Sequence, residues 1–403
     1  MHSPTKMGRR RYDGFVLRKK NRQILLIVTI WLTISILRFG FFIDEKDFYT
    51  DDGACFVLAA AKLSGELLGP QFLERLLNSS IQFKEIWISN QYDCSIHSQR
   101  FLPVFTLVPF VALFKESMLW ILPMVIAGLV LILSPYLIDL RKDSSYFAFI
   151  LSLCMVLSTN IHKLGMTFNV DILIAAYLVL FIILLQRFYL SGSTVTLLSL
   201  LAVSAFLYFS RLTLPWILIA IFICSRSVNS NSRIFNKTTL RLSFLIFSLH
   251  FVLYKYVNFV PRLPNFEIFS TGGYEINSQP SQYQEPIVKD FAEEGYSRVE
   301  TFLTPFIYPT KEFVRLLVFD PLISMMIFGV LFTCLRTLKR FFVSRSWARL
   351  SEFALMLTST IGLMFSSVLW ANYPGMGFGL ILPGIPLTII CATLYSNQVK
   401  NWR

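Results

Sequence analysis

The chain has 403 residues, of which 55% are hydrophobic and only 15% are charged. A soluble protein carries about 25% charged residues, so this composition excludes an ordinary soluble domain and predicts a protein that lies mostly in a lipid bilayer. The formal net charge of +13 also occurs in nucleic-acid-binding proteins, but here the basic residues cluster in short segments between apolar runs. We therefore expect no nucleic-acid partner.

The distribution of charge predicts which segments face the cytoplasm. Residues 1–23 hold eight Lys and Arg and one acid, residues 224–241 hold four and none, and residues 335–350 hold five and none. Such an excess is typical of cytoplasmic loops. Residues 44–100 hold nine acids and five bases, and residues 261–312 hold eight and four, so we expect both outside. Both termini are then cytoplasmic, and the chain is a multi-pass protein of the cytoplasmic (plasma) membrane.

The expected fold class is all-α, a polytopic helical bundle of about ten transmembrane helices with two external loops. In chain order we expect a basic cytoplasmic N-terminus (1–23), a first transmembrane helix (24–43), an external loop with amphipathic helices (44–117), a transmembrane helical region (118–259), a second external loop (260–312), C-terminal transmembrane helices (313–396) and a cytoplasmic tail (397–403). No small-residue cleavage site follows the first apolar run, so we interpret it as an uncleaved helix.

Two apolar runs are expected to depart from simple spanning helices. Residues 101–114 are too few to span a bilayer and include two prolines, which predicts an interfacial or re-entrant piece. The run 194–223 has Arg211 near its middle. One straight helix would place this arginine at mid-membrane, at a cost of about 2.5–3.5 kcal/mol, so we predict two short helices that meet in an external hairpin.

The pair Asp51-Asp52 follows the first transmembrane helix on the predicted external side. Carboxylates at this depth in a membrane protein often hold a substrate, an ion or a proton. The alternative is structural, because Thr50 can cap an amphipathic helix whose first turn favours acids. In the same loop, Cys55 and Cys94 form either a disulfide or two free thiols.

Several short motifs resemble the GT-C class of membrane glycosyltransferases, which use polyprenyl-phosphate-linked sugars. The segment from Thr50 to Ala54 is similar to the T-D-D-A motif of one branch, and a helix that ends in a glycine follows it. The segments Arg100-Phe101-Leu102-Pro103, HKLGMTFNVD (162–171) and Phe209-Ser210-Arg211-Leu212-Thr213 resemble, in family order, the end of the first loop, a polar turn and the T-R-x-t hairpin.

This resemblance implies a GT-C-like fold and an enzyme, a glycosyltransferase. It would move a sugar from a polyprenyl-phosphate donor to a hydroxyl of a glycan, lipid or protein acceptor on the outer face of the membrane. Asp52 would take the acceptor's proton, with Asp51 as its neighbour or substitute. We expect the substrate to be bound by Arg211, Arg100, Lys163, His162 and Asp171. The pattern implies no particular cofactor, and a divalent metal held by Asp171 beside Asp51 is compatible with it.

Each of these side chains also has a structural interpretation. Arg100 can lie at the membrane interface, His162 and Lys163 can cap the helix that precedes them, and Asp171 can pair with Lys163. An O-antigen-type polymerase or ligase needs external arginines too, and a transporter or flippase is a non-enzymatic alternative. The sequence specifies neither the sugar, nor the acceptor, nor whether the sugar's configuration inverts.

Overall fold

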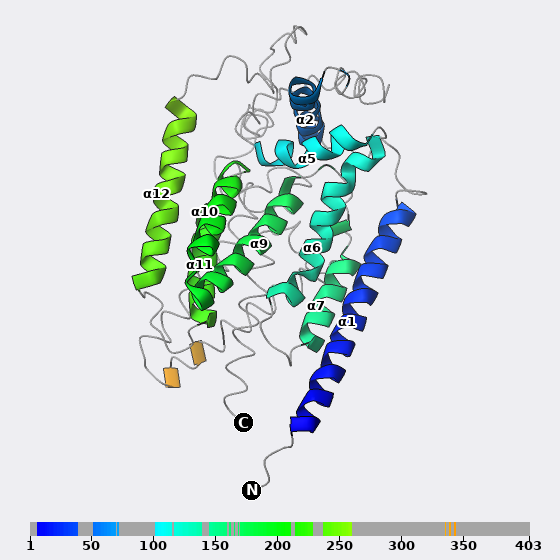
Figure 1. The fold of residues 1–403 in the computed structure, drawn as a ribbon, viewed down its shortest axis with the longest axis vertical. Helices are drawn as coiled ribbons and strands as arrows, with labels where there is room; N and C mark the ends of the chain where they lie inside the picture. The colour runs from blue at the N-terminus through cyan, green and yellow to red at the C-terminus, as the bar shows by residue number, and fades with distance from the viewer. Residues whose placement is uncertain are drawn as a thin grey trace, which may run out of the picture.

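The computed structural model describes residues 6–38, 51–69, 71, 101–114, 117–138, 145–158, 161–162, 165, 168, 170–210, 214–228, 237–259, 335, 338–339 and 342–343. Every regular element in these ranges is a helix (Figure 1). The expected all-α class is therefore confirmed for the described part of the chain. The second predicted loop and most of the C-terminal helices lie outside it.

The described helices follow one another in chain order. Their bounds are α1 (Lys6–Leu37), α2 (Asp51–Leu68), α5 (Phe101–Leu113), the 3-10 helix η4 (Ser117–Ile121), α6 (Leu122–Ile138), α7 (Ser145–Leu157), α9 (Val170–Ser191), α10 (Thr194–Tyr208), α11 (Leu214–Val228) and α12 (Lys237–Phe259). Helix α5 matches the expected run 101–114, and α10 and α11 both begin within the expected run 194–223. Helix α1 begins well before the expected residue 24, because the lysines and arginines before it are good helix formers.

Three helices are long and apolar enough to cross a membrane, and their apolar windows are Lys20–Leu37, Leu119–Ile138 and Asp171–Ser191. Shorter apolar helices include Leu102–Leu113 and Thr194–Tyr208. The predicted break into two short helices is confirmed, because α10 ends at Tyr208 and α11 begins at Leu214. The external position of the turn between them stays a prediction. The expected total of about ten spans depends largely on segments outside the described residues.

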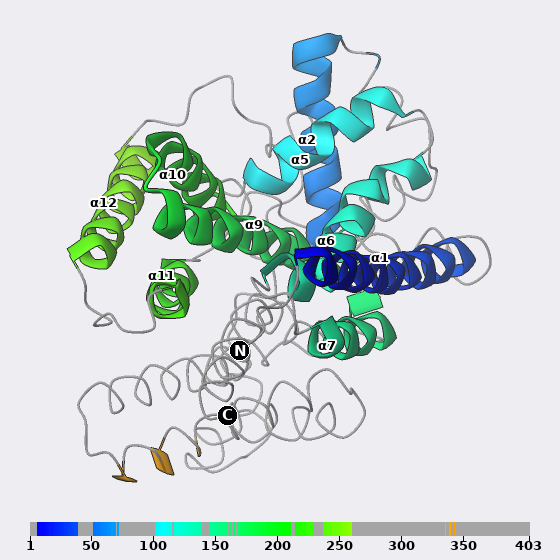
Figure 2. The same cartoon turned by 60° about the horizontal axis from the view of Figure 1, so that its bottom comes forward.

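Helix α9 occupies the centre of the described bundle. It packs against α6 on one side and against α10 and α11 on the other. Helices α1 and α7 contact each other and α6, and α12 contacts α10 and α11. Figures 1 and 2 show the same arrangement, with α1, α6 and α7 on one side of α9 and α10, α11 and α12 on the other. The two groups are therefore joined through α9.

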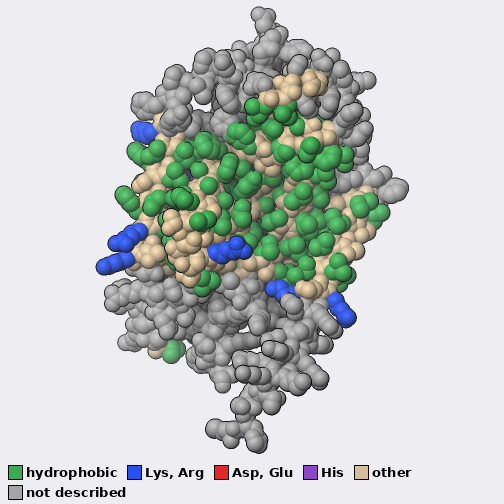
Figure 3. All heavy atoms as spheres, in the orientation of Figure 1, with side chains coloured by type: hydrophobic (Ala, Val, Ile, Leu, Met, Phe, Trp, Pro, Cys, Tyr) green, Lys and Arg blue, Asp and Glu red, His purple; other side chains and the backbone are tan. Residues whose placement is uncertain are grey.

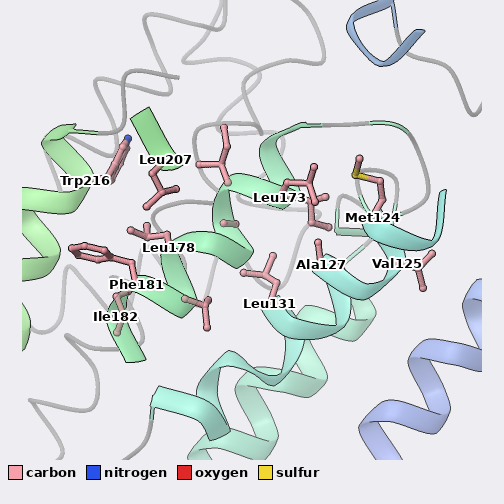
Figure 4. Packing of buried hydrophobic residues seen from close by; sticks show 14 of the residues in the cluster. Met124, Val125, Ala127, Leu131, Leu173, Leu178, Phe181, Ile182, Leu207 and Trp216 are labelled. Carbon is pink, nitrogen blue, oxygen red and sulfur yellow. The ribbon is translucent and has the colours of Figure 1, made fainter. Parts of the chain in front are cut away.

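The seam between α6 and α9 continues toward α11. Leu131 of α6, Leu173 and Phe181 of α9, and Trp216 of α11 are all buried in one cluster, part of which appears in Figure 4. Between helices in a membrane, apolar burial gains little over contact with lipid tails, so close packing and hydrogen bonds hold the helices together. The large share of buried side chains on α9 fits that role.

Two polar side chains of α12, His250 and Thr239, tie this helix to its neighbours. Nε2 of His250 lies 2.9 Å from the Ser204 hydroxyl of α10. Nearer the start of α12, the Thr239 hydroxyl lies 3.1 Å from that of Tyr189 on α9 and 2.7 Å from that of Ser225 on α11. Because these bonds lie about three helical turns apart along α12, they fix both the position and the rotation of this helix.

The two ends of the bundle differ in charge and in content. Helices α2 and α5 lie at one end, which we call the α2 end; α1 and α10 end there, and α6 and α9 begin there (Figure 1). Figure 3 shows a broad band of hydrophobic side chains, with most visible lysines and arginines along its margin away from the α2 end. Among exposed residues, Arg187 lies about one turn before the end of α9, and Lys237 begins α12. This basic margin is the side that we assign to the cytoplasm from sequence.

Trp31 fixes α1 to the rest of the bundle. Its indole is fully buried, and Nε1 donates a hydrogen bond to the Val125 carbonyl of α6 at 3.2 Å. Two glycines make room for the ring. A Cβ added to Gly128 would lie 2.5 Å from Cζ2 of Trp31, and one added to Gly165 would lie 2.9 Å from Cη2. A methyl group at either position would force the indole out of its place.

We expect Gly128→Ala to lower the free energy of unfolding by about 1–3 kcal/mol, the usual cost of overpacking a close contact. Thermal unfolding in detergent measures this. The matched control adds Trp31→Phe, because phenylalanine lacks Cζ2. In the double variant the alanine should cost much less than it does beside Trp31. Equal costs in the two backgrounds would mean that Gly128 does not act through the indole.

Candidate functional site

Helix α2 begins with the predicted acid pair. Asp51 and Asp52 form the first turn of the helix, where carboxylates are favoured by the exposed N–H groups and the helix dipole. The helix ends at Gly69, whose φ of +126° is accessible to glycine but not to most residues, and whose N–H bonds the Gly65 carbonyl at 3.0 Å. The expected helix that begins at the acid pair is thus present, with Gly65 inside it. Cys94 lies outside the described residues.

Helix α5 connects α2 to the rest of the α2 end. It packs along α2, and its Thr106 hydroxyl lies 3.4 Å from that of Tyr177 on α9. At its start, the Leu102 N–H bonds the carbonyl of Phe209, just beyond α10, at 3.5 Å. The short apolar run predicted to be interfacial therefore bridges three helices.

The contact between Leu102 and Phe209 bears on two predicted substrate ligands. Arg100 precedes Leu102 by two residues and Arg211 follows Phe209 by two. Both arginines lie outside the described residues, as does Lys163. In the sequence, each arginine therefore lies beside one end of this hydrogen bond.

The turn after α7 places His162 in the interior. The Ser158 hydroxyl accepts a hydrogen bond from the Ile161 N–H at 3.4 Å, and the Ser158 carbonyl accepts one from the His162 N–H at 3.2 Å. The imidazole is only 6% exposed. Its Nε2 bonds the carbonyl of Val156, and its ring stacks on Trp31 with a centroid distance of 4.9 Å and an interplanar angle of 21°.

Two buried polar atoms beside Trp31 have no hydrogen-bond partner among the described residues. One is Nδ1 of His162, and the other is the hydroxyl oxygen of Ser35. Ser35 is 3% exposed and follows Trp31 by four residues, so both lie on one face of α1. The sequence offered no signal for either Trp31 or Ser35, because a tryptophan and a serine are ordinary in an apolar helix.

Asp171 lies close to this group in the fold. It is in the first turn of α9 and is 6% exposed. Cδ1 of the next residue, Ile172, lies 3.2 Å from the position of an added Cβ on Gly165, which contacts Trp31. His162 and Asp171 are therefore brought to the same region of the α2 end, around the outer part of α1 and the start of α9. Within the described ranges, no three His, Cys, Asp or Glu side chains gather as a metal site.

His162 is held in its neutral form. Burial lowers the pKa of His162 below its ordinary value, and the positive charge of Arg38 lowers it further, whereas the hydrogen bond to Val156 raises it. A positively charged imidazole would be costly in this apolar setting. His162 thus differs from the cationic phosphate ligand that we expect from the sequence.

Comparisons of the chain with protein-family models, curated proteins and solved structures found no match. The residues and their arrangement therefore carry the functional argument.

The lowered pKa of His162 predicts a stability that depends on pH. Below about pH 6.5, the ordinary pKa of histidine, the unfolded chain binds a proton that the folded protein does not. The contribution to stability is therefore complete above about pH 6.5 and is lost as the pH falls toward the folded-state pKa. From about pH 7.5 to about pH 5.5, the Tm of the parent should fall more than that of His162→Gln. Parallel falls would show that His162 is not the group responsible.

Proposed function

We propose that the protein is a membrane glycosyltransferase with a GT-C-like bundle of about ten transmembrane helices and both termini in the cytoplasm. The observation that carries this proposal is the gathering of the acid-bearing start of α2, the junction of α5 with α10, His162 and the buried Asp171 at the α2 end. A transferase that acts on a membrane-anchored donor needs acid, cations and polar groups at one face of the bilayer. The basic margin at the opposite end supports an external location for this face.

In the proposed reaction, the carboxylate of Asp52 takes the proton from the acceptor hydroxyl. The acceptor oxygen then forms a bond to the anomeric carbon of the sugar. The bond between that carbon and the phosphate oxygen breaks, and its electron pair leaves with the polyprenyl phosphate. Asp51 is the neighbouring carboxylate that keeps the region acidic.

Negative charge grows on the departing phosphate oxygen, so positively charged side chains aimed at this atom stabilise the transition state. We assign this role to Arg211 and Arg100, which lie in the sequence beside the two residues joined at the α5–α10 junction, and to Lys163. An arginine can hold two phosphate oxygens at once. To Asp171 we assign the orientation of the acceptor.

The alternative functions make different demands on the same residues. An O-antigen-type polymerase or ligase would need the arginines but no carboxylate directly after α1. A transporter or flippase would be expected to have broken helices and polar groups at mid-membrane. Here a pair of carboxylates begins α2, the next described helix after α1. The transferase needs a carboxylate at this position, so the pair favours it.

We expect Asp52→Asn to abolish sugar transfer while leaving insertion and folding intact, because an amide has no lone pair basic enough to take the acceptor proton. Transfer of labelled sugar from polyprenyl-phosphate donors by purified protein in lipid tests this. Glu66→Gln, a change of the same kind on the same helix, should retain activity. Full activity of Asp52→Asn would remove the proposed base.

Arg211→Gln should weaken both the binding of the donor and its turnover. A hydrogen bond to a charged group contributes about 1.5–3 kcal/mol, so kcat/KM for the donor should fall about 10- to 100-fold. Arg211→Lys should recover only part of this loss, because lysine lacks the two-pronged geometry. An unchanged kcat/KM in Arg211→Gln would show that Arg211 does not bind the donor phosphate.

A further inference from the structure

The buried imidazole of His162 has a defined tautomer. A carbonyl oxygen can only accept a hydrogen bond, so the contact with Val156 requires a hydrogen on Nε2. In the neutral ring, Nδ1 then carries a lone pair and can only accept. The hydrogen bond from Nε2 to Val156 therefore fixes Nδ1 as an acceptor.

This acceptor has no partner among the described residues, although the atom is buried. A buried acceptor without a partner is costly, and native structures contain few of them. The nearby hydroxyl of Ser35 is in the same situation. The Trp31 indole, which stacks on the imidazole, lies one helical turn from Ser35. Two polar groups beside one aromatic ring are thus left for another molecule to satisfy.

The polarity of Nδ1 decides which ligand group can bind. A phosphate oxygen also presents lone pairs, so it cannot bond to Nδ1 of the neutral ring. A hydroxyl group donates a hydrogen and can. Burial in contact with Trp31 opposes protonation of the ring, which would be needed to reverse this preference. The ligand group is therefore a hydrogen-bond donor, and the hydroxyls of a sugar are donors of this kind.

We infer that Nδ1 of His162 accepts a hydrogen bond from a hydroxyl of the sugar carried by the lipid donor. This inference rests on the proposed function, in which cations bind the donor's phosphate and another group must recognise its sugar. His162 then distinguishes a sugar-bearing lipid from the bare polyprenyl phosphate that leaves after transfer. Because Nδ1 is buried, the sugar reaches it by displacing part of the packing around the ring.

The test compares two substitutions that each keep one half of the imidazole's hydrogen bonding. His162→Gln keeps a donor for the Val156 carbonyl and removes the acceptor at Nδ1. His162→Asn keeps an acceptor near the Nδ1 position and removes the bond to Val156. Each whole protein is placed in lipid nanodiscs, and its affinity is measured for polyprenyl-phosphate-mannose, polyprenyl-phosphate-arabinose and polyprenyl phosphate.

The parent should bind at least one of the two sugar-bearing lipids more tightly than polyprenyl phosphate. His162→Gln should weaken binding of that lipid about tenfold, equivalent to about 1.4 kcal/mol, and leave the affinity for polyprenyl phosphate within about twofold. His162→Asn should retain most of the preference for sugar. A His162→Gln protein that binds all three lipids as the parent does, or loses affinity for all equally, would overturn the inference.

A second measurement uses the unsubstituted chain and is independent of how the variants fold. In protein labelled with ¹⁵N-histidine, the Nδ1 resonance of His162 should shift toward that of a hydrogen-bonded acceptor with the sugar-bearing lipid and not with polyprenyl phosphate. An unmoved resonance with bound glycolipid would overturn the inference alone. A parent that binds none of the lipids would overturn the proposed function as well.

Discussion

The packing of α9 against helices on both of its sides holds the described bundle together. On one side, α6 contacts α1 and α7. On the other side, α10 and α11 contact α12. Because lipid tails solvate an apolar helix as well as another helix does, this arrangement depends on shape and on a few hydrogen bonds. Asp171 lies in the first turn of α9, so this part of the candidate site is attached to the helix that joins the two groups.

Much of the fold could be predicted because it depends on residues that are close together in the sequence. The lengths of apolar runs give the approximate bounds of α6, α7 and α9, and the cost of placing Arg211 at mid-membrane gives the break between α10 and α11. The glycine at the end of α2 is a local signal too. The extension of α1 to Lys6 could not be predicted from hydropathy, because a basic segment has the same low hydropathy whether it continues the helix or forms a loop.

The site was less accessible to sequence reasoning, since its chemistry depends on long-range contacts. His162 beside Lys163 in a polar turn resembles a pair of cations. Its neutral state comes from the Val156 carbonyl and the Trp31 ring, and nothing in the turn itself indicates that an indole from the first helix covers it. The sequence likewise does not indicate that Ser35 is buried. The acid pair and the arginines stay predictions, because a motif gives their identity but not their distances.

The contacts of Trp31 also bear on how the chain assembles. Val125 lies 94 residues further along the chain, and Gly165 and His162 come later still. When the ribosome has completed α1, none of the groups that receive its indole yet exists. The first helix must therefore enter the bilayer alone, with an unpaired indole N–H, and wait there or beside the insertion machinery until α6 and the turn after α7 have been made. Its final docking is a late event in biogenesis, although it is the first helix to be synthesised.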